Sequence, residues 1–104
     1  MKEFNVTIET AARQDMLEIR RYISNTLKEP AVAKRIYEAI KAAVLTLEQH
    51  PMRHAVVPDE PYGSLGIRPL YVENYTAFYI VDEQVKTVHI IRVLYNRREW
   101  QNLI

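Results

Sequence analysis

Two apolar stripes with helical spacing follow each other in the first half of the sequence, and they constrain the fold more than any other feature. The first consists of Ala12, Met16, Ile19, Ile23 and Leu27. Residues spaced by three or four lie on one face of an α-helix, so this stripe predicts an amphipathic helix over about 11–27. Thr10 precedes it and offers a hydroxyl group as the N-cap.

The second stripe is stronger and predicts a helix over about 30–49. Its members are Ala33, Ile36, Tyr37, Ile40, Ala43, Val44 and Leu47. Glu29-Pro30 marks the restart, because proline fits the first helical position and disfavours helix before it. His50-Pro51 ends the helix. Two long helices joined by a few residues should form an antiparallel hairpin.

The other apolar segments have strand character. Phe4, Val6 and Ile8 alternate with polar residues and predict a strand over about 3–9. After a proline-rich loop over 51–65, the segments 67–72, 75–81 and 85–94 are separated by short turn signals, so they should form an antiparallel meander. Pro69 moves the segment 67–72 toward a sheet edge.

The predicted order is therefore β-α-α-β-β-β, an α+β fold in which the helical hairpin covers one face of an antiparallel sheet. The strand over 3–9 must join this sheet to bury its apolar side chains. A short helix is expected in the tail over 95–104. The length of 104 residues is close to the commonest domain size, so we expect one domain over 1–104.

The composition excludes several classes of protein and of chemical site. The chain has no cysteine, which excludes a disulfide scaffold, a thiolate metal site and a cysteine nucleophile. The three histidines share no i, i+4 spacing, so we expect no metal and no cofactor. No apolar run is long enough to cross a membrane and the N-terminus lacks a signal-peptide pattern, so a cytoplasmic protein is expected.

The charge is unevenly distributed along the chain, although the formal net charge is only +1. Residues 51–84 carry 2 basic and 5 acidic side chains, whereas residues 85–104 carry 4 basic and 1 acidic. The basic residues of this last segment are Lys86, Arg92, Arg97 and Arg98. This asymmetry predicts an anion-facing end of the molecule.

Four segments in this order carry a resemblance to the RelE/ParE superfamily of type II toxin–antitoxin toxins. The helix over 11–23 is similar to the family's opening A-x-x-D-L-x-x-I-x-x-Y-I pattern, and Leu47-Glu48-Gln49-His50-Pro51 closes the second helix. The segment 74–83 is similar to N-Y-x-x-x-Y-x-V-D-E, and the segment 91–100 to I-x-R-V-L-H-x-R-R-D. Together these segments span nearly the whole chain.

The resemblance implies a growth-inhibiting toxin with one of two targets, or an inactive family member that only binds its antitoxin. RelE-like members cut mRNA on the ribosome without a metal, and the positions here that match their catalytic groups are Arg68, Tyr95, Arg97 and Arg98. In this scheme the arginines hold the scissile phosphate and Tyr95 donates a proton. ParE-like members bind DNA gyrase and perform no hydrolysis.

The resemblance also implies a cognate antitoxin, which we expect to cover the apolar surface of the helices and the basic end. Structural alternatives stand beside the functional ones for several residues. Arg97 and Arg98 could form a solvated turn, and Arg68 could be an ordinary edge-strand arginine. Arg92 is expected to reach past the sheet edge or to pair with an acid. Trp100 is expected to anchor the tail on the core rather than to stack on a base.

Overall fold

The computed structural model describes residues 2–96 and 99–104 and contains one mixed sheet. Its strands are β1 (Asn5–Ile8), β2 (Arg68–Val72), β3 (Tyr75–Asp82) and β4 (Thr87–Tyr95), in the spatial order β1-β4-β3-β2. The strands β2, β3 and β4 form the predicted antiparallel meander, and β2 is an edge strand as Pro69 indicated. β1 joins the sheet beside β4, but it runs parallel to β4, so the prediction of a wholly antiparallel sheet is corrected at this edge.

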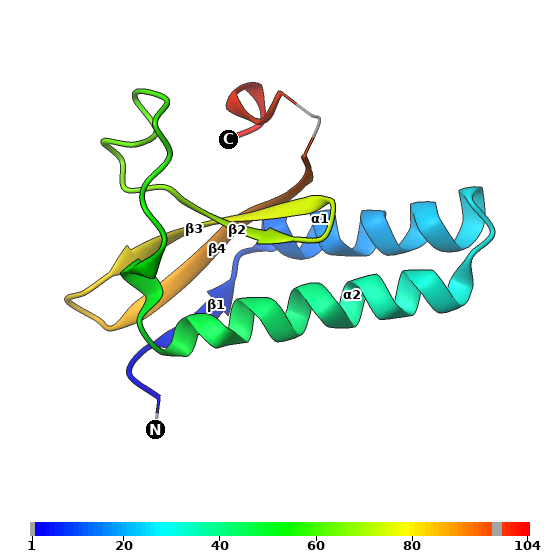
Figure 1. The fold of residues 1–104 in the computed structure, drawn as a ribbon, viewed down its shortest axis with the longest axis horizontal. Helices are drawn as coiled ribbons and strands as arrows, with labels where there is room; N and C mark the ends of the chain where they lie inside the picture. The colour runs from blue at the N-terminus through cyan, green and yellow to red at the C-terminus, as the bar shows by residue number, and fades with distance from the viewer. Residues whose placement is uncertain (1, 97–98) are drawn as a thin grey trace.

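The predicted helical hairpin lies on one face of this sheet (Figure 1). It consists of α1 (Thr10–Arg21), a π-helical turn (Tyr22–Thr26) and α2 (Pro30–Leu45). Pro30 occupies the first turn of α2 as expected. The N-cap prediction for Thr10 is wrong by one position, because Glu9 has the extended cap conformation and Thr10 is already helical.

Two apolar cores lie on opposite faces of the sheet. The larger core fills the space between the hairpin and the sheet, and its fully buried side chains include Ile40, Val44, Leu47, Tyr79, Val88, Ile90 and Val93. The smaller core lies on the other face, beneath the loop after α2 and the C-terminal segment, and it contains Val57, Ile67, Phe78 and Leu94. Figure 1 shows this loop and the C-terminus on the side of the sheet away from the helices.

The C-terminal segment is anchored on the smaller core by Trp100, which confirms the expected packing role. Its ring lies 4.8 Å from the ring of Phe78 and 5.1 Å from that of Tyr62. The Tyr62 hydroxyl donates a hydrogen bond of 2.8 Å to the Gln101 carbonyl oxygen. The expected short helix is a single 3-10 turn over Trp100–Asn102.

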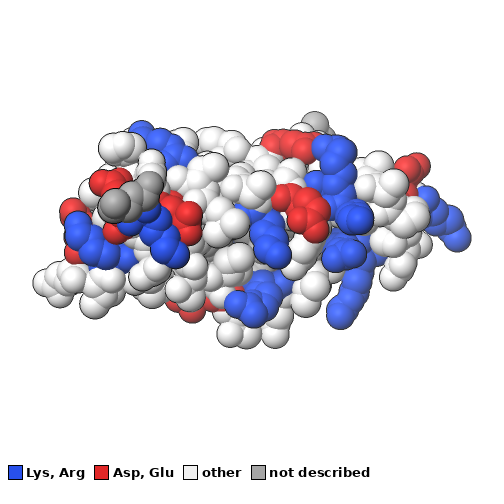
Figure 2. All heavy atoms as spheres, turned by 90° about the horizontal axis from the view of Figure 1, so that it is seen from below, with Lys and Arg blue, Asp and Glu red and all other residues white. Residues whose placement is uncertain are grey.

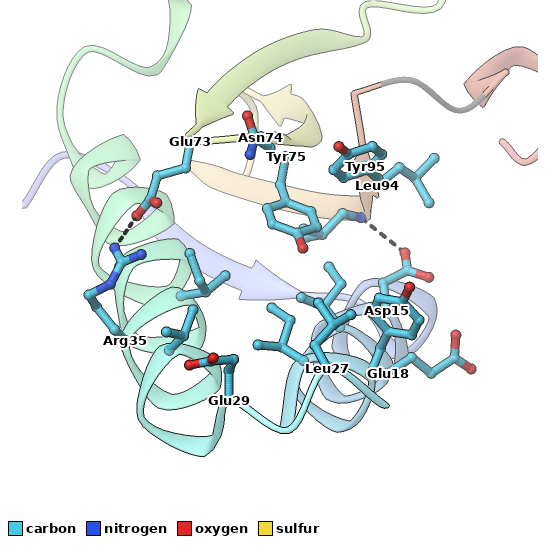
Figure 3. A pocket seen from close by; sticks show the side chains of 16 residues that line it. Asp15, Glu18, Leu27, Glu29, Arg35, Glu73, Asn74, Tyr75, Leu94 and Tyr95 are labelled. Atoms are coloured by element: carbon cyan, nitrogen blue, oxygen red, sulfur yellow. Dashed lines mark hydrogen bonds and ion pairs between the residues drawn. The ribbon is translucent and has the colours of Figure 1, made fainter. Parts of the chain in front are cut away.

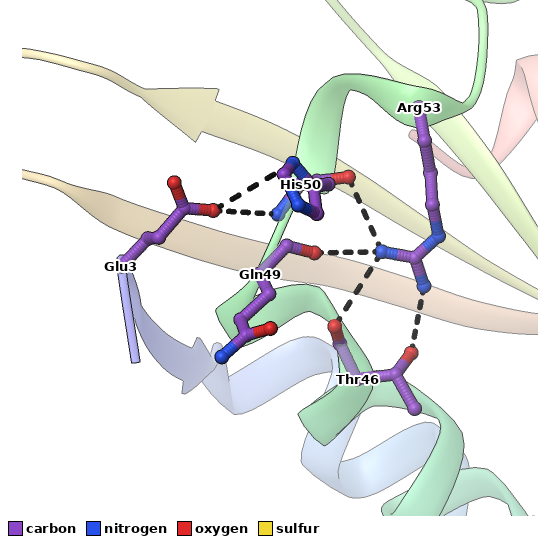
Figure 4. A network of polar contacts seen from close by, with 5 residues as sticks. All are labelled: Glu3, Thr46, Gln49, His50 and Arg53. Atoms are coloured by element: carbon purple, nitrogen blue, oxygen red, sulfur yellow. Dashed lines mark hydrogen bonds and ion pairs between the residues drawn. The ribbon is translucent and has the colours of Figure 1, made fainter. Parts of the chain in front are cut away.

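The C-terminal end of α2 is closed by Arg53 (Figure 4). After a 3-10 turn (Thr46–Glu48) the chain bends sharply at His50, whose φ of 47° lies in the left-handed region. Arg53 then returns over this end and donates to the carbonyl oxygens of Gln49 at 2.8 Å and His50 at 3.2 Å, and to the Thr46 hydroxyl at 2.8 Å. A cation near the last carbonyls of a helix also interacts favourably with the helix dipole.

Replacing Arg53 with alanine is therefore expected to lower the free energy of unfolding by about 1 kcal/mol, since an exposed cap is worth less than a buried one. Urea denaturation of the two proteins measures this difference. Arg53→Lys keeps the charge but has no planar fork, so it should recover only part of the loss. Full recovery with lysine would show that charge alone matters.

Candidate functional site

A groove of about 870 Å³ opens where the far end of the helical hairpin extends beyond the sheet (Figure 3). One wall comes from α1, the π-helical turn and the start of α2, and the other comes from the β2–β3 turn and the end of β4. Its apolar lining consists of Ile19, Tyr22, Ile23, Leu27, Val32, Ile36, Tyr75, Val93, Leu94 and Tyr95. The groove is thus an apolar depression between the far end of the hairpin and the facing ends of β3 and β4 with the β2–β3 turn.

Two of the apolar side chains that line this groove are unusually exposed for their type. Tyr22 is 55% exposed and Leu27 is 52% exposed. Both lie at the end of the hairpin, where the helix widens into a π-helical turn and the chain then reverses through Lys28 at a φ of 56°. Large apolar side chains that remain in water beside an apolar groove mark a surface that another molecule covers.

The rim of the groove is predominantly acidic. Four carboxylates line the groove, from Asp15, Glu18, Glu29 and Glu73, and Arg35 is the basic residue among the lining residues. Asp15 is buried and pairs with Arg92, so Glu18 and Glu29 are the lining carboxylates without an ion pair in the described part of the chain. Arg35 is itself paired with Glu73 at 2.7 Å (Figure 3). The groove therefore favours a ligand that has apolar side chains for the floor and positive charge for the rim.

Asp15 is the buried polar residue of this wall, and it holds three parts of the fold together. Its carboxylate accepts hydrogen bonds from Arg92 Nε at 2.7 Å and Nη2 at 2.8 Å, and from the backbone N–H of Val93 at 3.0 Å. Arg92 also donates to the carbonyl oxygen of Leu103 in the C-terminal segment. The bond to Asp15 raises the pKa of Arg92, with burial opposing it, so the guanidinium stays charged.

Of the two alternatives expected for Arg92, the structure confirms the pairing with an acid. The importance of Asp15 was missed in the sequence, although a signal was present. Asp15 stands on the apolar stripe of α1, three residues after Ala12 and four before Ile19. A carboxylate on the buried face of an amphipathic helix needs a cationic partner.

Tyr95 lies on the wall of the groove and packs against Tyr75 with the ring centroids 5.6 Å apart. Burial raises the pKa of Tyr75, and the neighbouring Tyr95, Glu73 and Tyr22 add to this effect. The Tyr75 phenol therefore keeps its proton. Within the described part of the chain no group pairs with its hydroxyl, so it can donate to a molecule in the groove.

Arg68 lies far from Tyr95, at the other end of the meander. Arg68 is opposite Tyr79 on β3, whereas Tyr95 is opposite Tyr75. Four residues of extended strand separate these positions by roughly 13 Å. The Arg68 guanidinium donates to the carbonyl oxygen of His54 at 2.5 Å. The structure therefore does not bring these two predicted catalytic residues together, and the predicted Arg97 and Arg98 lie outside the described residues.

His54 lies in a positively charged, partly buried environment beside Arg68. Burial lowers the pKa of His54, and the charges of Arg53 and Arg68 lower it further. Its Nε2 atom is buried without a hydrogen-bond partner among the described residues. The imidazole is therefore held neutral at the edge of the larger core, where its ring centroid lies 6.5 Å from that of Tyr79.

This environment predicts a pH dependence of stability. The unfolded chain takes up a proton at His54 near the ordinary pKa of 6.5, whereas the native chain resists it until a lower pH. The contribution of the neutral ring is thus present above pH 6.5 and is lost as the pH falls below it, by at most about 1.4 kcal/mol per pH unit. His54→Gln should reduce the difference in unfolding free energy between pH 7.5 and pH 5.5. Equal pH dependence in both proteins would contradict this assignment.

The described ranges contain neither a cluster of metal-ligating side chains nor a helix that could span a membrane. No cluster of three or more His, Asp or Glu side chains able to hold an ion occurs within residues 2–96 and 99–104. In the same ranges, every helix is too short or too polar to span a bilayer.

The family model of the ParE toxin of the type II toxin–antitoxin system parDE matches residues 6–100. The chain therefore belongs to the ParE toxin family, which confirms the resemblance drawn from the sequence. No curated protein matches it in sequence.

Solved structures of related systems share the fold. The chromosomal ParDE system from P. aeruginosa superposes with a TM-score of 0.73 at 24% identity, covering 89% of this chain and 96% of that one. The RelBE2 toxin–antitoxin complex from Mycobacterium tuberculosis gives a TM-score of 0.68 at 22% identity over 89% and 98% of the two chains. The RelE–RelB complex from Pyrococcus horikoshii OT3 gives 0.61 at 16% identity over 92% and 98%.

Proposed function

We propose that this toxin arrests growth in the cytoplasm by binding DNA gyrase and performs no hydrolysis of its own. The observation that carries the proposal is the separation of Arg68 from Tyr95 along the sheet. Metal-free RNA cleavage needs a base, an acid and cations around one phosphate. The match to a family model named for ParE rather than RelE agrees with a gyrase target.

A cognate antitoxin is the second part of the proposal, and its site is the acidic-rimmed groove. Two of the structural neighbours are toxin–antitoxin complexes of the RelBE type, and a third is a ParDE system. The antitoxin segment places apolar side chains over Leu27 and Tyr22, and places Lys or Arg near Glu18 and Glu29. The Tyr75 hydroxyl supplies a hydrogen bond to this segment.

The target is tested by induction of the toxin followed by two parallel measurements. Plasmid supercoiling and DNA breaks report gyrase inhibition, and primer extension on translated transcripts reports cleavage of mRNA. DNA breaks with intact mRNA are the expected result. Early cleavage within codons would overturn the gyrase proposal in favour of a ribosome-dependent RNase, and the absence of any growth defect would indicate an inactive antitoxin-binding member.

Two variants sharpen this test. Tyr95→Phe and Arg68→Gln remove the predicted acid and one predicted phosphate ligand. Growth inhibition should change by less than about threefold if the toxin performs no hydrolysis. Loss of a general acid would lower the cleavage rate of an RNase by about a hundredfold or more. Arg68 also donates a hydrogen bond to the His54 carbonyl oxygen in the loop. The melting temperature of the Arg68→Gln variant is therefore measured together with its growth inhibition. The same comparison applies to Arg97→Ala with Arg98→Ala.

A further inference from the structure

The outer side of the helical hairpin carries a second charged surface, opposite in sign to the groove. Four exposed cations form it: Arg13 and Arg20 on α1, and Lys34 and Lys41 on α2. Figure 2 shows the molecule from the helix side, with several Lys and Arg side chains across this face and Asp and Glu side chains between them. We call these four residues the basic seam.

Helix geometry explains why the four cations form one row. Residues seven apart lie on the same face of an α-helix, which aligns Arg13 with Arg20 and Lys34 with Lys41. The two faces meet because the Arg20 guanidinium lies 5.1 Å from the centre of the Tyr37 ring. The seam therefore runs along the junction of the antiparallel helices.

The contact between Arg20 and Tyr37 also sets the register of the row. At 1.5 Å per residue, the cations follow in the order Arg13, Lys41, Arg20, Lys34 at intervals of roughly 5 Å. The row spans roughly 15 Å, and a DNA strand carries one phosphate about every 3.4 Å of duplex axis, so the seam faces about four phosphates.

The seam has few internal charge partners. In the part of the chain that the structure describes, none of its four cations forms an ion pair. Glu38 is exposed on α2 between Lys34 and Lys41, four and three residues from them, and makes no ion pair in the described part of the chain. By contrast, the groove side of the same hairpin is rich in carboxylates. A surface whose cations are unneutralised attracts a polyanion.

We propose that the basic seam binds the phosphate backbone of duplex DNA. The choice of DNA as the polyanion rests on the proposed function, because a toxin that acts on gyrase meets its target on DNA. The seam leaves the groove free, so antitoxin and DNA occupy different sides of the hairpin. The contacts are to phosphate and give no preference for base sequence.

Fluorescence anisotropy with a labelled 20-base-pair duplex and the full-length toxin tests this proposal without gyrase. The affinity should fall with salt, with a slope of log K against log [KCl] near −3.6 for about four contacts. Lys34→Gln with Lys41→Gln should weaken binding at least tenfold at 50 mM KCl and reduce the slope by about 2. Glu38→Gln removes the carboxylate of the seam and should strengthen binding.

The matched control is Lys2→Gln with Lys86→Gln, which removes the same charge at the other end of the molecule. It should weaken binding less than threefold. Equal losses in the two double variants, or no binding to the duplex at 50 mM KCl, would overturn the proposal. If the seam variant binds DNA normally but loses inhibition of gyrase, the seam binds an acidic protein surface instead. If the toxin does not inhibit gyrase but binds the duplex as expected, the proposed function fails and DNA binding by the basic seam still holds. The two proposals are therefore tested separately.

Discussion

Replacing Asp15 with alanine is expected to lower the free energy of unfolding by about 3 kcal/mol. The change removes the acceptor for two guanidinium hydrogen bonds and for the Val93 N–H. It leaves the Arg92 side chain, only 23% exposed, without its carboxylate. Breaking a buried ion pair on one side costs about 3–5 kcal/mol, and the partial exposure of Arg92 places this one at the lower end. The melting temperature of the Asp15→Ala variant should fall by at least about 12 °C.

The control for this prediction removes both charges together. Asp15→Leu with Arg92→Met replaces the pair with apolar side chains of similar size, and such replacements are often nearly neutral. The double variant should therefore be more stable than either single variant, which a double-mutant cycle measures. If the two single losses simply add, the ion pair is not the source of the effect.

The same guanidinium holds the C-terminal segment through the Leu103 carbonyl oxygen. In Arg92→Met, the amide protons of residues 101–104 should exchange faster than in the parent. Trp100 still packs on Phe78 in this variant, so the segment should loosen rather than detach.

The order of elements could be predicted from the sequence because each element has a local signal. Phe4, Val6 and Ile8 alternate, the two helical stripes have the helical period, and Pro30 marks the restart. The expected partner of Arg92 and the anchoring role of Trp100 followed from their apolar surroundings. These features depend on a residue and its near neighbours in sequence, and such features are well determined by pattern.

Features that depend on register could not be predicted in this way. The direction of β1 beside β4 is decided by how the hairpin crosses the sheet, and no local pattern reports it. Arg68 and Tyr95 both belong to terminal positions of strands in the meander, and the sequence alone does not show which ends of these strands lie together. The pairing of β2 and β4 with β3 instead places them at different ends. The groove could not be predicted because it forms where the hairpin extends beyond the sheet, and its lining residues come from segments far apart in the sequence.

Tyr22→Asp with Leu27→Asp is expected to lower the affinity for the cognate antitoxin at least a hundredfold. The two apolar side chains are more than half exposed at the mouth of the groove, so a partner that covers them gains their burial. Central aromatic and aliphatic anchors of an interface contribute about 2 kcal/mol or more each, and a hundredfold is about 2.7 kcal/mol. The new carboxylates would attract the Lys or Arg side chains of the partner, as the acidic rim does. The expected loss of affinity therefore comes from the removal of the apolar contacts.

Titration calorimetry with the purified antitoxin measures the affinity, and co-expression measures neutralisation in the cell. The variant toxin should fold, because both positions are exposed, and should inhibit growth even when the antitoxin is present. The matched control is Leu65→Asp with Val85→Asp, since these side chains are 62% and 61% exposed and do not line the groove. Unchanged antitoxin affinity in the Tyr22 and Leu27 variant would place the antitoxin elsewhere, because an interface that fills the groove cannot avoid the two side chains at its mouth.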